Sequence, residues 1–389
     1  MKPQVIDLFS GAGGLSYGFE QAGCEVILAI EKDSWAVQTY AANHKNQNIL
    51  EADINTLSDD FFLQYQGKVD IVIGGPPCQG FSIAASNRRN VDDVRNYLYR
   101  QFLRVVDIVK PKVVLIENVK EIIGYKLPDG TKIVEDIKDF FDKAGYICGY
   151  SILNCREYGI PQDRKRFFLL AVNNKPNDYA IDLKHLMEQF KQPEVSFGDA
   201  VSDLPIVFAR QYEENAVLEY DKPPYNDYQS KMRENNNLIH NHIPMRHTDK
   251  TVQKFIYLLE HNGDQLPNEL KPRMRSHTDI ISESTYSQNH RIIDKNKVSP
   301  TITASFYSSF IHPEQPRNLT VREAARIQSF PDSFVFYGKR TTLSKKLLEK
   351  KGIVEEIHLD QFNQVGNAVP PLLAYQLATI CSKYVEGRI

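Results

Sequence analysis

The chain has 389 residues, a formal net charge of −2, and 42% hydrophobic and 25% charged residues, the composition of an ordinary globular protein. This length favours two domains, and no apolar run reaches the ~20 residues of a membrane span. The five cysteines are scattered without a Cys-x-x-Cys pair, which argues against a disulfide framework or a structural zinc. The same cysteine pattern suits a reducing compartment, so we expect a cytoplasmic protein. Met1 leads at once into a strand-like run, with no secretory segment expected ahead of it.

Strand-like and helix-like runs alternate over the first ~180 residues, as in an α/β sheet. A helix over 131–143 and strands over 147–153 and 167–172 complete the pattern. We therefore predict an α/β fold with a doubly wound sheet. The earlier strands are expected at 5–9, 25–30, 48–53, 69–73 and 112–117, with helices at 15–22, 33–43 and 93–109.

The chain changes character from about residue 185 to 315, where Asn, Tyr, His, Arg and Pro are frequent and periodicity is weak. We interpret it as a second domain of loops and short elements. The predicted division is a first domain at 1–184, a second at 185–345 and a C-terminal segment at 346–389 that returns to the first domain. His240, His242 and His247 gather here, but the acids and second cluster of a metal site are missing, so we expect no metal.

The first strand leads into a glycine-rich turn whose backbone can approach a ligand closely. A nicotinamide fingerprint is not met, because Ser16 stands where its third glycine is required. Glu31 and Asp53 end the second and third strands, where carboxylates can bind a ribose and an adenine. This pattern fits a site for a nucleoside that carries no pyrophosphate. The alternative is a tight turn beside two solvent-exposed acids that bind no ligand.

A stiff loop follows the fourth strand, with the sequence Gly74-Gly75-Pro76-Pro77-Cys78-Gln79-Gly80-Phe81-Ser82. Its prolines fix φ and remove two backbone donors, which suits a nucleophile that must stay aimed. The loop starts at the carboxyl end of a strand, where open α/β sheets place their chemistry. Alone, the motif fits a catalytic thiol or an inert cysteine in a rigid turn.

In chain order, these and later motifs resemble the C5-cytosine DNA methyltransferases of the bacterial and phage modification type. They span nearly the whole chain except 185–290, which varies in that family. The resemblance implies a Rossmann-like, S-adenosylmethionine-dependent methyltransferase domain and a smaller target-recognition domain that binds double-stranded DNA. The motifs are Asp7–Gly14, Glu31, Asp53, Gly75–Ser82, Glu117–Val119, Gln162–Arg166, Arg322–Pro331 and Gln364–Pro370.

The same resemblance implies S-adenosyl-L-methionine above the carboxyl edge of the sheet. Phe9 would pack on the adenine, Glu31 would hold the ribose, and Asp53 would bind the adenine amine. Lys32 departs from several relatives, which have an aromatic residue there, so stacking on that side is weaker or comes from another residue. The full implied cofactor set is Phe9, Gly11, Gly13, Gly14, Glu31, Asp53, Ile54, Pro77, Leu98, Asn367 and Val369.

The residue types suit methylation of a carbon. A thiolate of Cys78 adding at cytosine C6 would make C5 nucleophilic, and Glu117, with a pKa raised by burial, could supply a proton at N3. By resemblance, Arg166 would bind the cytosine O2 and Arg164 would position Glu117 or the base. An arginine pair in a strand-edge salt bridge is the structural alternative.

A cytosine inside a duplex hides C6, so the target base must leave the stack. Because the net charge is slightly negative, DNA contacts must come from local basic surfaces. The expected DNA-binding residues are Ser82, Arg88, Arg89, Arg246, Arg273, Arg275 and Arg291. We expect a monomer, with a cognate restriction endonuclease as a separately acting partner.

Three other functions compete with this one. A tRNA-modifying relative would carry a Cys-Phe-Thr signature that is not found here. A DNA-binding protein without catalysis is disfavoured because Cys78, Glu117 and Arg166 are all present. A nicotinamide oxidoreductase is disfavoured by the glycine spacing.

Overall fold

The computed structural model describes residues 2–45, 48–77, 97–173, 180–213, 215–234, 236–263, 265–271, 273, 281 and 291–389. Two compact units are formed. Unit 1 contains Met1–Gly159, Arg164–Pro193 and Ala368–Ile389, and unit 2 contains Ile160–Asp163 and Glu194–Asn367. The return of the chain to unit 1 therefore occurs at Ala368. Five predicted site residues lie outside the described part of the chain: Cys78, Ser82, Arg88, Arg89 and Arg275.

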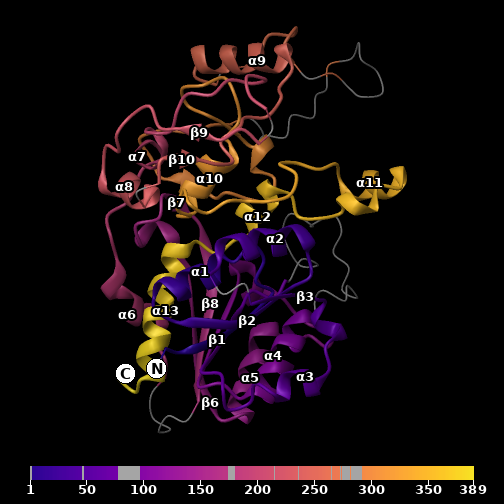
Figure 1. The fold of residues 1–389 in the computed structure, drawn as a ribbon, viewed down its shortest axis with the longest axis vertical. Coiled ribbons are helices and arrows are strands. Elements are labelled where there is room, and N and C mark those ends of the chain that lie inside the picture. The colour runs from indigo at the N-terminus through magenta and orange to yellow at the C-terminus, as the bar shows by residue number, and fades with distance from the viewer. Residues whose placement is uncertain are drawn as a thin grey trace. The chain divides into compact units, whose positions relative to one another are not determined.

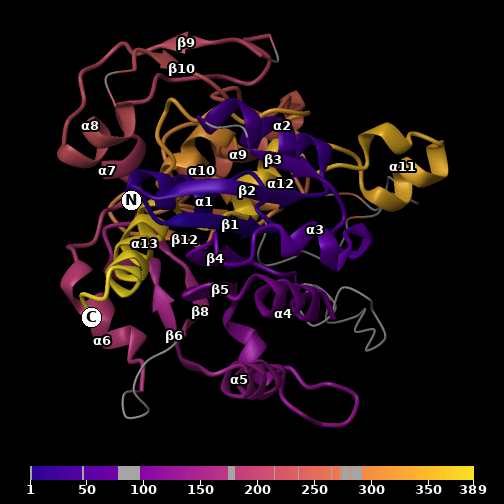
Figure 2. The same cartoon turned by 60° about the horizontal axis from the view of Figure 1, so that its bottom comes forward.

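Unit 1 is built on a seven-stranded sheet with the order β3-β2-β1-β4-β5-β8-β6, which Figure 2 shows from β3 to β6. The first five of these strands are parallel, and β8 is antiparallel to both of its neighbours. The strand order reverses its direction between β1 and β4, which is where open sheets of this kind bind ligands. The strands are β1 (Gln4–Leu8), β2 (Glu25–Glu31), β3 (Ile49–Glu51), β4 (Ile71–Gly74), β5 (Val113–Val119), β6 (Tyr146–Asn154) and β8 (Lys165–Asn173).

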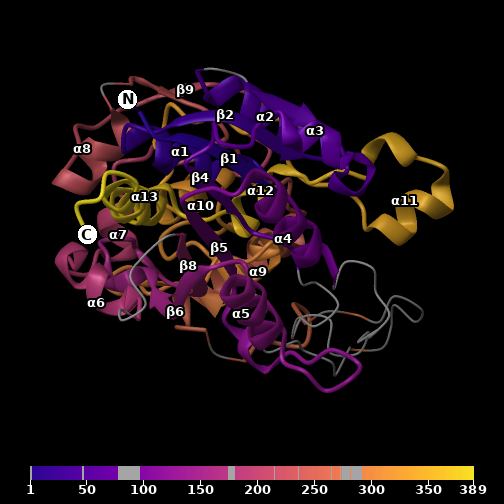
Figure 3. The same ribbon diagram turned by 90° about the horizontal axis from the view of Figure 1, so that it is seen from below.

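Helices of unit 1 lie on both faces of this sheet (Figures 1 and 3). The C-terminal helix α13 packs along α1 on one face, although the two are at opposite ends of the sequence. Helices α4 and α5 cover the other face. The helices are α1 (Gly14–Gln21), α2 (Ser34–Asn43), α3 (Asp59–Leu63), α4 (Leu98–Val109), α5 (Ile133–Lys143), α6 (Leu183–Met187) and α13 (Pro371–Val385), with the short 3₁₀ turns η1 (Ile54–Thr56), η5 (Lys120–Gly124), η6 (Cys155–Glu157) and η7 (Glu188–Phe190).

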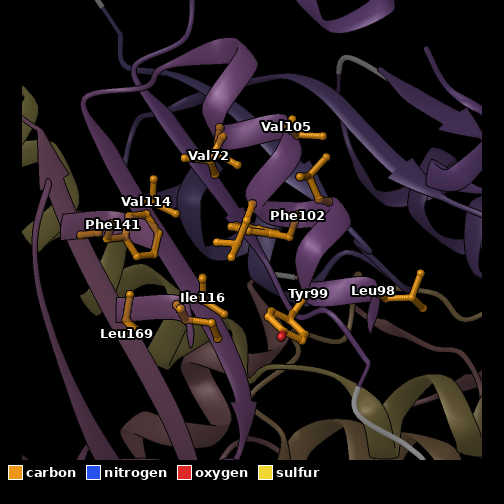
Figure 4. Packing of buried hydrophobic residues seen from close by; sticks show 14 of the residues in the cluster. Val72, Leu98, Tyr99, Phe102, Val105, Val114, Ile116, Phe141 and Leu169 are labelled. Carbon is orange, nitrogen blue, oxygen red and sulfur yellow. The ribbon is translucent and has the colours of Figure 1, made fainter. Parts of the chain in front are cut away.

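The core beneath α4 follows from two periodicities. Alternate residues of the strands point to this face, as Val72, Val114 and Ile116 do, while α4 contributes Phe102 and Val105 (Figure 4). All of them are buried. The neighbouring strand residues Ile73, Val113 and Leu115 point to the opposite face and are buried too. These strands are therefore apolar almost throughout, as expected for parallel strands covered on both sides.

The described elements match most of the sequence predictions. Each expected strand is present within three residues at either end, because buried β-branched runs mark strands clearly. The helix predicted at 93–109 is described from Leu98 onward. The short helix α3 was not expected; Ser58 caps it by accepting the backbone N–H of Phe61. The alternation of strand-like and helix-like runs in the sequence also did not predict that β8 is antiparallel to its neighbours.

Unit 2 is made of short elements, as its weak periodicity predicted. Most of its strands contain only two residues, and α9 is the longest helix among its described residues. The elements are β7 (Gln162–Asp163), α7 (Phe197–Val201), β9 (Leu218–Glu219), α8 (Asp227–Arg233), β10 (Leu238–Ile239), α9 (Asp249–Glu260), β11 (Arg291–Ile292), β12 (Ser299–Pro300), η8 (Phe306–Ser308), β13 (Phe310–Ile311), α10 (Val321–Ile327), α11 (Lys345–Lys351), η9 (Val354–Glu356) and α12 (Gln361–Asn367).

Buried arginines organise unit 2 around α10. Arg317 donates hydrogen bonds from both terminal nitrogens to the Glu323 carboxylate, at 2.8 and 2.6 Å. Glu323 also forms a capping box with Thr320 at the start of α10. Arg326 contacts the carboxylates of Asp203 and Asp332 and donates to the Ala200 carbonyl at 2.9 Å. These charge-assisted bonds connect segments that have little regular backbone pairing of their own.

One of the histidines that cluster in the sequence, His242, lies inside this core. His242 is fully buried, with one ring nitrogen 2.9 Å from Thr320 Oγ1 and the other 2.9 Å from the Pro205 carbonyl. Burial lowers its pKa to about 4, so the ring stays neutral near pH 7. Among the described residues, no group of His, Cys, Asp and Glu side chains has a metal-binding arrangement. Within those same ranges, no helix is both long and apolar enough to cross a membrane.

We expect Gly18→Ala to destabilise unit 1, because a Cβ there would approach Ala374 and the backbone of Pro371 and Tyr375 closer than 3.0 Å. Overpacking of this kind costs about 1–3 kcal/mol. Gly124→Ala is the control, because a Cβ at Gly124 meets nothing within 4 Å. Urea unfolding of both variants measures the difference, and equal midpoints would contradict the close packing of α1 against α13.

Candidate active site

Four strand ends meet at one edge of the sheet in unit 1. The pairing aligns Leu8 with Ile30 of β2 and with Gly74 of β4, and Gly74 with Ile116 of β5. The next residue of each strand or loop is therefore Phe9, Glu31, Gly75 and Glu117 in turn. Residues from four of the predicted motifs thus form one row at the carboxyl edge.

The glycine turn after β1 has a backbone that ordinary residues rarely adopt. Phe9, Gly11 and Gly13 have φ values of 61°, 55° and 92°. A left-handed Phe9 is strained, since a side chain at positive φ costs about 1–2 kcal/mol. Gly13 is required for a second reason, because a Cβ there would overlap the His44 ring. Gly14, buried, begins α1 directly after the turn.

Glu31 ties this turn to the end of β2. Its carboxylate accepts the backbone N–H groups of Gly11 at 3.0 Å, Lys32 at 2.8 Å and Asp33 at 2.9 Å. Burial raises the pKa of Glu31, while the three N–H donors oppose that rise. The sequence marked Glu31 as a ligand-binding acid but gave no signal of its bond to Gly11.

Asp53 caps the turn η1 and leaves one oxygen toward Lys32. Its Oδ1 accepts the backbone N–H of Asn55 at 3.0 Å and the Asn55 side-chain amide at 2.7 Å. Its Oδ2 lies 3.6 Å from Lys32 Nζ. Although partial burial raises the pKa of Asp53, the Asn55 bonds and the Lys32 charge together hold it below the usual value. Lys32, at the position where the family's aromatic was expected, is thus an ion-pair partner of Asp53.

A buried polar chain that sequence reasoning missed runs beneath the glycine turn. Ser16 Oγ donates to Asp7 Oδ2 at 2.6 Å, and Tyr40 OH donates to Ser16 Oγ at 3.0 Å. Asp7 is fully buried, and burial raises its pKa to about 7. Its Oδ1 and the nearby Ser10 Oγ have no hydrogen-bond partner within the described ranges. The only signal in the sequence was an acid inside an apolar strand.

Glu117 and Arg166 form a close ion pair on β5 and β8. Arg166 pairs with Val119, two residues beyond Glu117 and so on the same face of the sheet. The Arg166 Nε lies 3.2 Å from Glu117 Oε1, with both side chains largely shielded from solvent. Burial raises the pKa of Glu117, and the charges of Arg166 and Arg164 oppose the rise. The salt bridge that the sequence left as the structural alternative for the arginines is thus present at Arg166, and the roles of both arginines toward cytosine stay predictions.

Arg164 lies deeper than Arg166 and binds a different segment. It is 1% exposed, and its Nη2 donates to the Ala368 carbonyl at 3.2 Å. Burial, with the neighbouring Arg166 charge, lowers its pKa to about 9. Arg164 therefore fastens the point where the C-terminal segment enters unit 1, next to the predicted cofactor residue Val369.

The described start of the Pro-Pro-Cys loop is fixed from two sides. Asn118 Nδ2 donates to the Pro76 carbonyl at 2.9 Å, which links the loop to the strand that carries Glu117. A Cβ on Gly75 would lie 3.0 Å from Glu117 Oε2, so glycine leaves room for the carboxylate. Pro77 is the last described residue before Cys78.

The other predicted site residues divide between the units. Ile54 and Leu98 are buried in the core of unit 1, and Asn367 is exposed at the end of α12 in unit 2. Arg246, Arg273 and Arg291 are exposed in unit 2, with Arg291 stacked 5.1 Å from the centre of the Phe310 ring. Their DNA contacts stay predictions.

The model of the C-5 cytosine-specific DNA methylase family matches residues 3–383. The chain belongs to this family. The predicted relationship is therefore confirmed, and the chain is a DNA cytosine-5-methyltransferase with the expected methyltransferase fold. The alternative of a nicotinamide oxidoreductase was wrong.

Individual relatives agree with this assignment. The type II methyltransferase M.DdeI of Desulfomicrobium norvegicum is 41% identical over 98% of this chain and 89% of its own length. The type II methyltransferase M1.HphI of Haemophilus parahaemolyticus is 34% identical over 97% and 86%. A prophage-encoded E. coli protein, described as a DNA modification methyltransferase, superposes with a TM-score of 0.73 at 27% identity, covering 99% of this chain and 100% of its own.

We expect Asp7 to make the enzyme's stability depend on pH. Its folded pKa of about 7 lies above the unfolded value of ~3.9, so the folded state holds the proton more tightly. The resulting stabilisation is complete below about pH 4 and is lost as pH rises to about 7, with a slope of at most ~1.4 kcal/mol per pH unit. Asp7→Asn should flatten this part of the curve in urea unfolding, whereas an unchanged slope would contradict the assignment. Asp33→Asn, at an acid whose side chain caps α2, is the control.

Proposed function

We propose that the enzyme transfers a methyl group from S-adenosyl-L-methionine to C5 of a flipped cytosine through a covalent bond between Cys78 and C6. The observation that carries the proposal is the Glu117–Arg166 pair. It puts a carboxyl with a raised pKa at the sheet edge where Gly75 and Pro76 begin the loop that leads to Cys78.

The residues around the glycine turn fit S-adenosyl-L-methionine. The strained turn of Phe9, Gly11 and Gly13 exposes backbone to a ligand, and the unpartnered Asp7 Oδ1 and Ser10 Oγ lie next to it in the chain. When bound, the cofactor supplies an electrophilic methyl group on a positively charged sulfur. The proposed pocket is Phe9, Gly11, Gly13, Gly14, Glu31, Asp53, Ile54, Pro77, Leu98, Asn367 and Val369.

The chain's own groups would then act in sequence. The Cys78 thiolate adds to C6 of cytosine, and electron density moves through the ring toward N3. Glu117, which burial favours in the protonated form, donates a proton to N3, while Arg166 binds O2 and keeps the carboxyl oriented. After C5 has gained the methyl group, loss of the C5 proton to water expels the Cys78 thiolate. N3 returns its proton to Glu117, which restores the aromatic ring.

Arg164 is proposed as a positioning residue for this chemistry. Its guanidinium is buried and donates to the Ala368 carbonyl. It would thus hold β8 and the C-terminal segment together while Glu117 changes its protonation state.

Unit 2 would choose the target sequence. Its exposed Arg246, Arg273 and Arg291 suit guanine or phosphate contacts, and Arg275, outside the described residues, joins them as a proposal. Ser82, Arg88 and Arg89 would contact the DNA around the flipped base.

The type II designation of the relatives supports a role in restriction and modification. We infer that a cognate endonuclease acts separately on the same DNA sequence, and that the methyltransferase works as a monomer in the cytoplasm. Transfer of labelled methyl groups to unmethylated duplex DNA, followed by base analysis, tests the reaction. Label in 5-methylcytosine at one short motif supports the proposal. If duplex DNA stays unlabelled and tRNA offered in a parallel assay is labelled, the result would favour a tRNA-modifying methyltransferase.

We expect Cys78→Ser to abolish methyl transfer and to leave cofactor affinity within a factor of two, because the proposed pocket is built mainly from other strands. The same variant should no longer be trapped covalently on duplexes that carry 5-fluorocytosine. Cys148→Ser is the control, since Cys148 lies on β6. Turnover of the Cys78 variant near that of wild type would contradict the nucleophile assignment.

We expect Glu31→Ala to weaken S-adenosylmethionine binding by ~1–3 kcal/mol, the range for lost hydrogen bonds to a charged group. Both the proposed ribose contact and the bond that fixes Gly11 would be lost. Calorimetric titration measures the affinity, with Glu51→Ala at the exposed end of β3 as the control. Equal affinities for the two variants would remove Glu31 from the pocket.

A further inference from the structure

The short helix α11 concentrates positive charge in unit 2. Between Lys339 and Lys351 the sequence has six basic residues and one acid, although the whole chain carries a net charge of −2. Two of these cations are used internally: Lys339 pairs with Glu356, and Arg340 donates to the Pro244 carbonyl at 2.9 Å. The remaining four are the lysines of α11 itself.

These lysines are not explained by the stability of the helix. Lys346 stands in the first turn, which contains no acidic residue and where the helix dipole disfavours a cation. Lys346 and Lys350 are four residues apart, so two like charges lie on one side of the helix. Only Lys350 and Lys351, in the last turn, suit the dipole. Charge that opposes local stability is typical of a functional surface.

The helix is nonetheless anchored at one end. Leu348 is buried, and its carbonyl accepts the backbone N–H of Ile353 at 3.1 Å. Gly352, with a φ of 68°, donates to the Glu349 carbonyl at 3.1 Å, so the two bonds close a Schellman motif. Lys346, Lys350 and Lys351 are exposed and form no ion pair with the described residues. Figures 1 and 3 show α11 projecting from unit 2 on two chain segments.

We propose that α11 is a phosphate-binding element that holds duplex DNA without reading its sequence. Duplex DNA carries one negative charge per ~1.7 Å of its axis, which matches a compact group of unpaired lysines. Contacts of this kind position a protein on DNA and raise its affinity for any sequence. The proposal rests on the proposed function, in which DNA is the substrate, and adds a contact surface to the one predicted from the arginines of unit 2.

The test is the salt dependence of binding to a fluorescent duplex of arbitrary sequence, measured by anisotropy with the full-length protein. In a triple variant with Lys346→Gln, Lys350→Gln and Lys351→Gln, the slope of log K against log salt should become shallower by up to ~2.7. This corresponds to about 0.9 for each lost phosphate contact. Affinity near 0.1 M salt should fall about tenfold or more. In methylation assays the change should appear in KM for DNA and leave kcat within twofold.

A matched set controls for total charge. Lys110, Lys138 and Lys191 each form a local ion pair, with Asp107, Glu135 and Glu188, and their change to Gln alters the net charge by the same amount. This set should keep the wild-type slope, as should a set with Lys→Arg at positions 346, 350 and 351. The single changes Lys346→Gln and Lys350→Gln should each lower the slope by ~0.9, which guards against misfolding of the triple variant.

The outcomes separate the two proposals. A wild-type slope in the Gln set would overturn the inference and leave an acidic protein as the partner for α11. An equal loss in the control set, or a loss in the Arg set, would also overturn it. A wild-type protein that bound no duplex at all would instead overturn the proposed function.

Discussion

The parallel pairing of β1 with β4 is the constraint on which the candidate site depends. The register aligns Leu8 with Gly74, and a Cβ at Gly74 would overlap the Leu8 carbonyl. The two strands can therefore lie this close only because position 74 is glycine. Since the sheet order reverses there, the turn after β1 and the loop after β4 leave the same edge. The proposed mechanism requires the cofactor turn and the thiol loop to lie in that relation.

Buried charge recurs in both units, with a different consequence in each. In unit 1, Glu117 has one close guanidinium partner, and burial raises its pKa above the usual value. In unit 2, Glu323 receives two bonds from Arg317, and those contacts hold its pKa well below the usual value. A fully bonded pair fixes a fold, whereas a partly compensated acid remains able to exchange a proton.

Local sequence predicted the sheet well because burial on both faces leaves a clear apolar run. It could not predict what depends on contacts distant in the chain, such as the antiparallel β8 or the bond between Glu31 and Gly11. The buried hydrogen-bonded chain of Asp7 was missed for a related reason, because its other members, Ser16 and Tyr40, come from two later helices. In unit 2 the arginines that replace regular pairing have no periodic signature, so only its irregularity was predictable. The roles of the site residues themselves stay predictions.

The packing of α13 along α1 has a consequence for synthesis. Unit 1 is assembled from three stretches of chain, and the last of them begins at Ala368, near the C-terminus. The stretch Glu194–Asn367 of unit 2 is synthesised before that segment. Unit 1 therefore stays incomplete, with the face of α1 that receives α13 uncovered, until α13 (Pro371–Val385) has been synthesised. The order of the chain therefore lets unit 2 complete its folding first and unit 1 last.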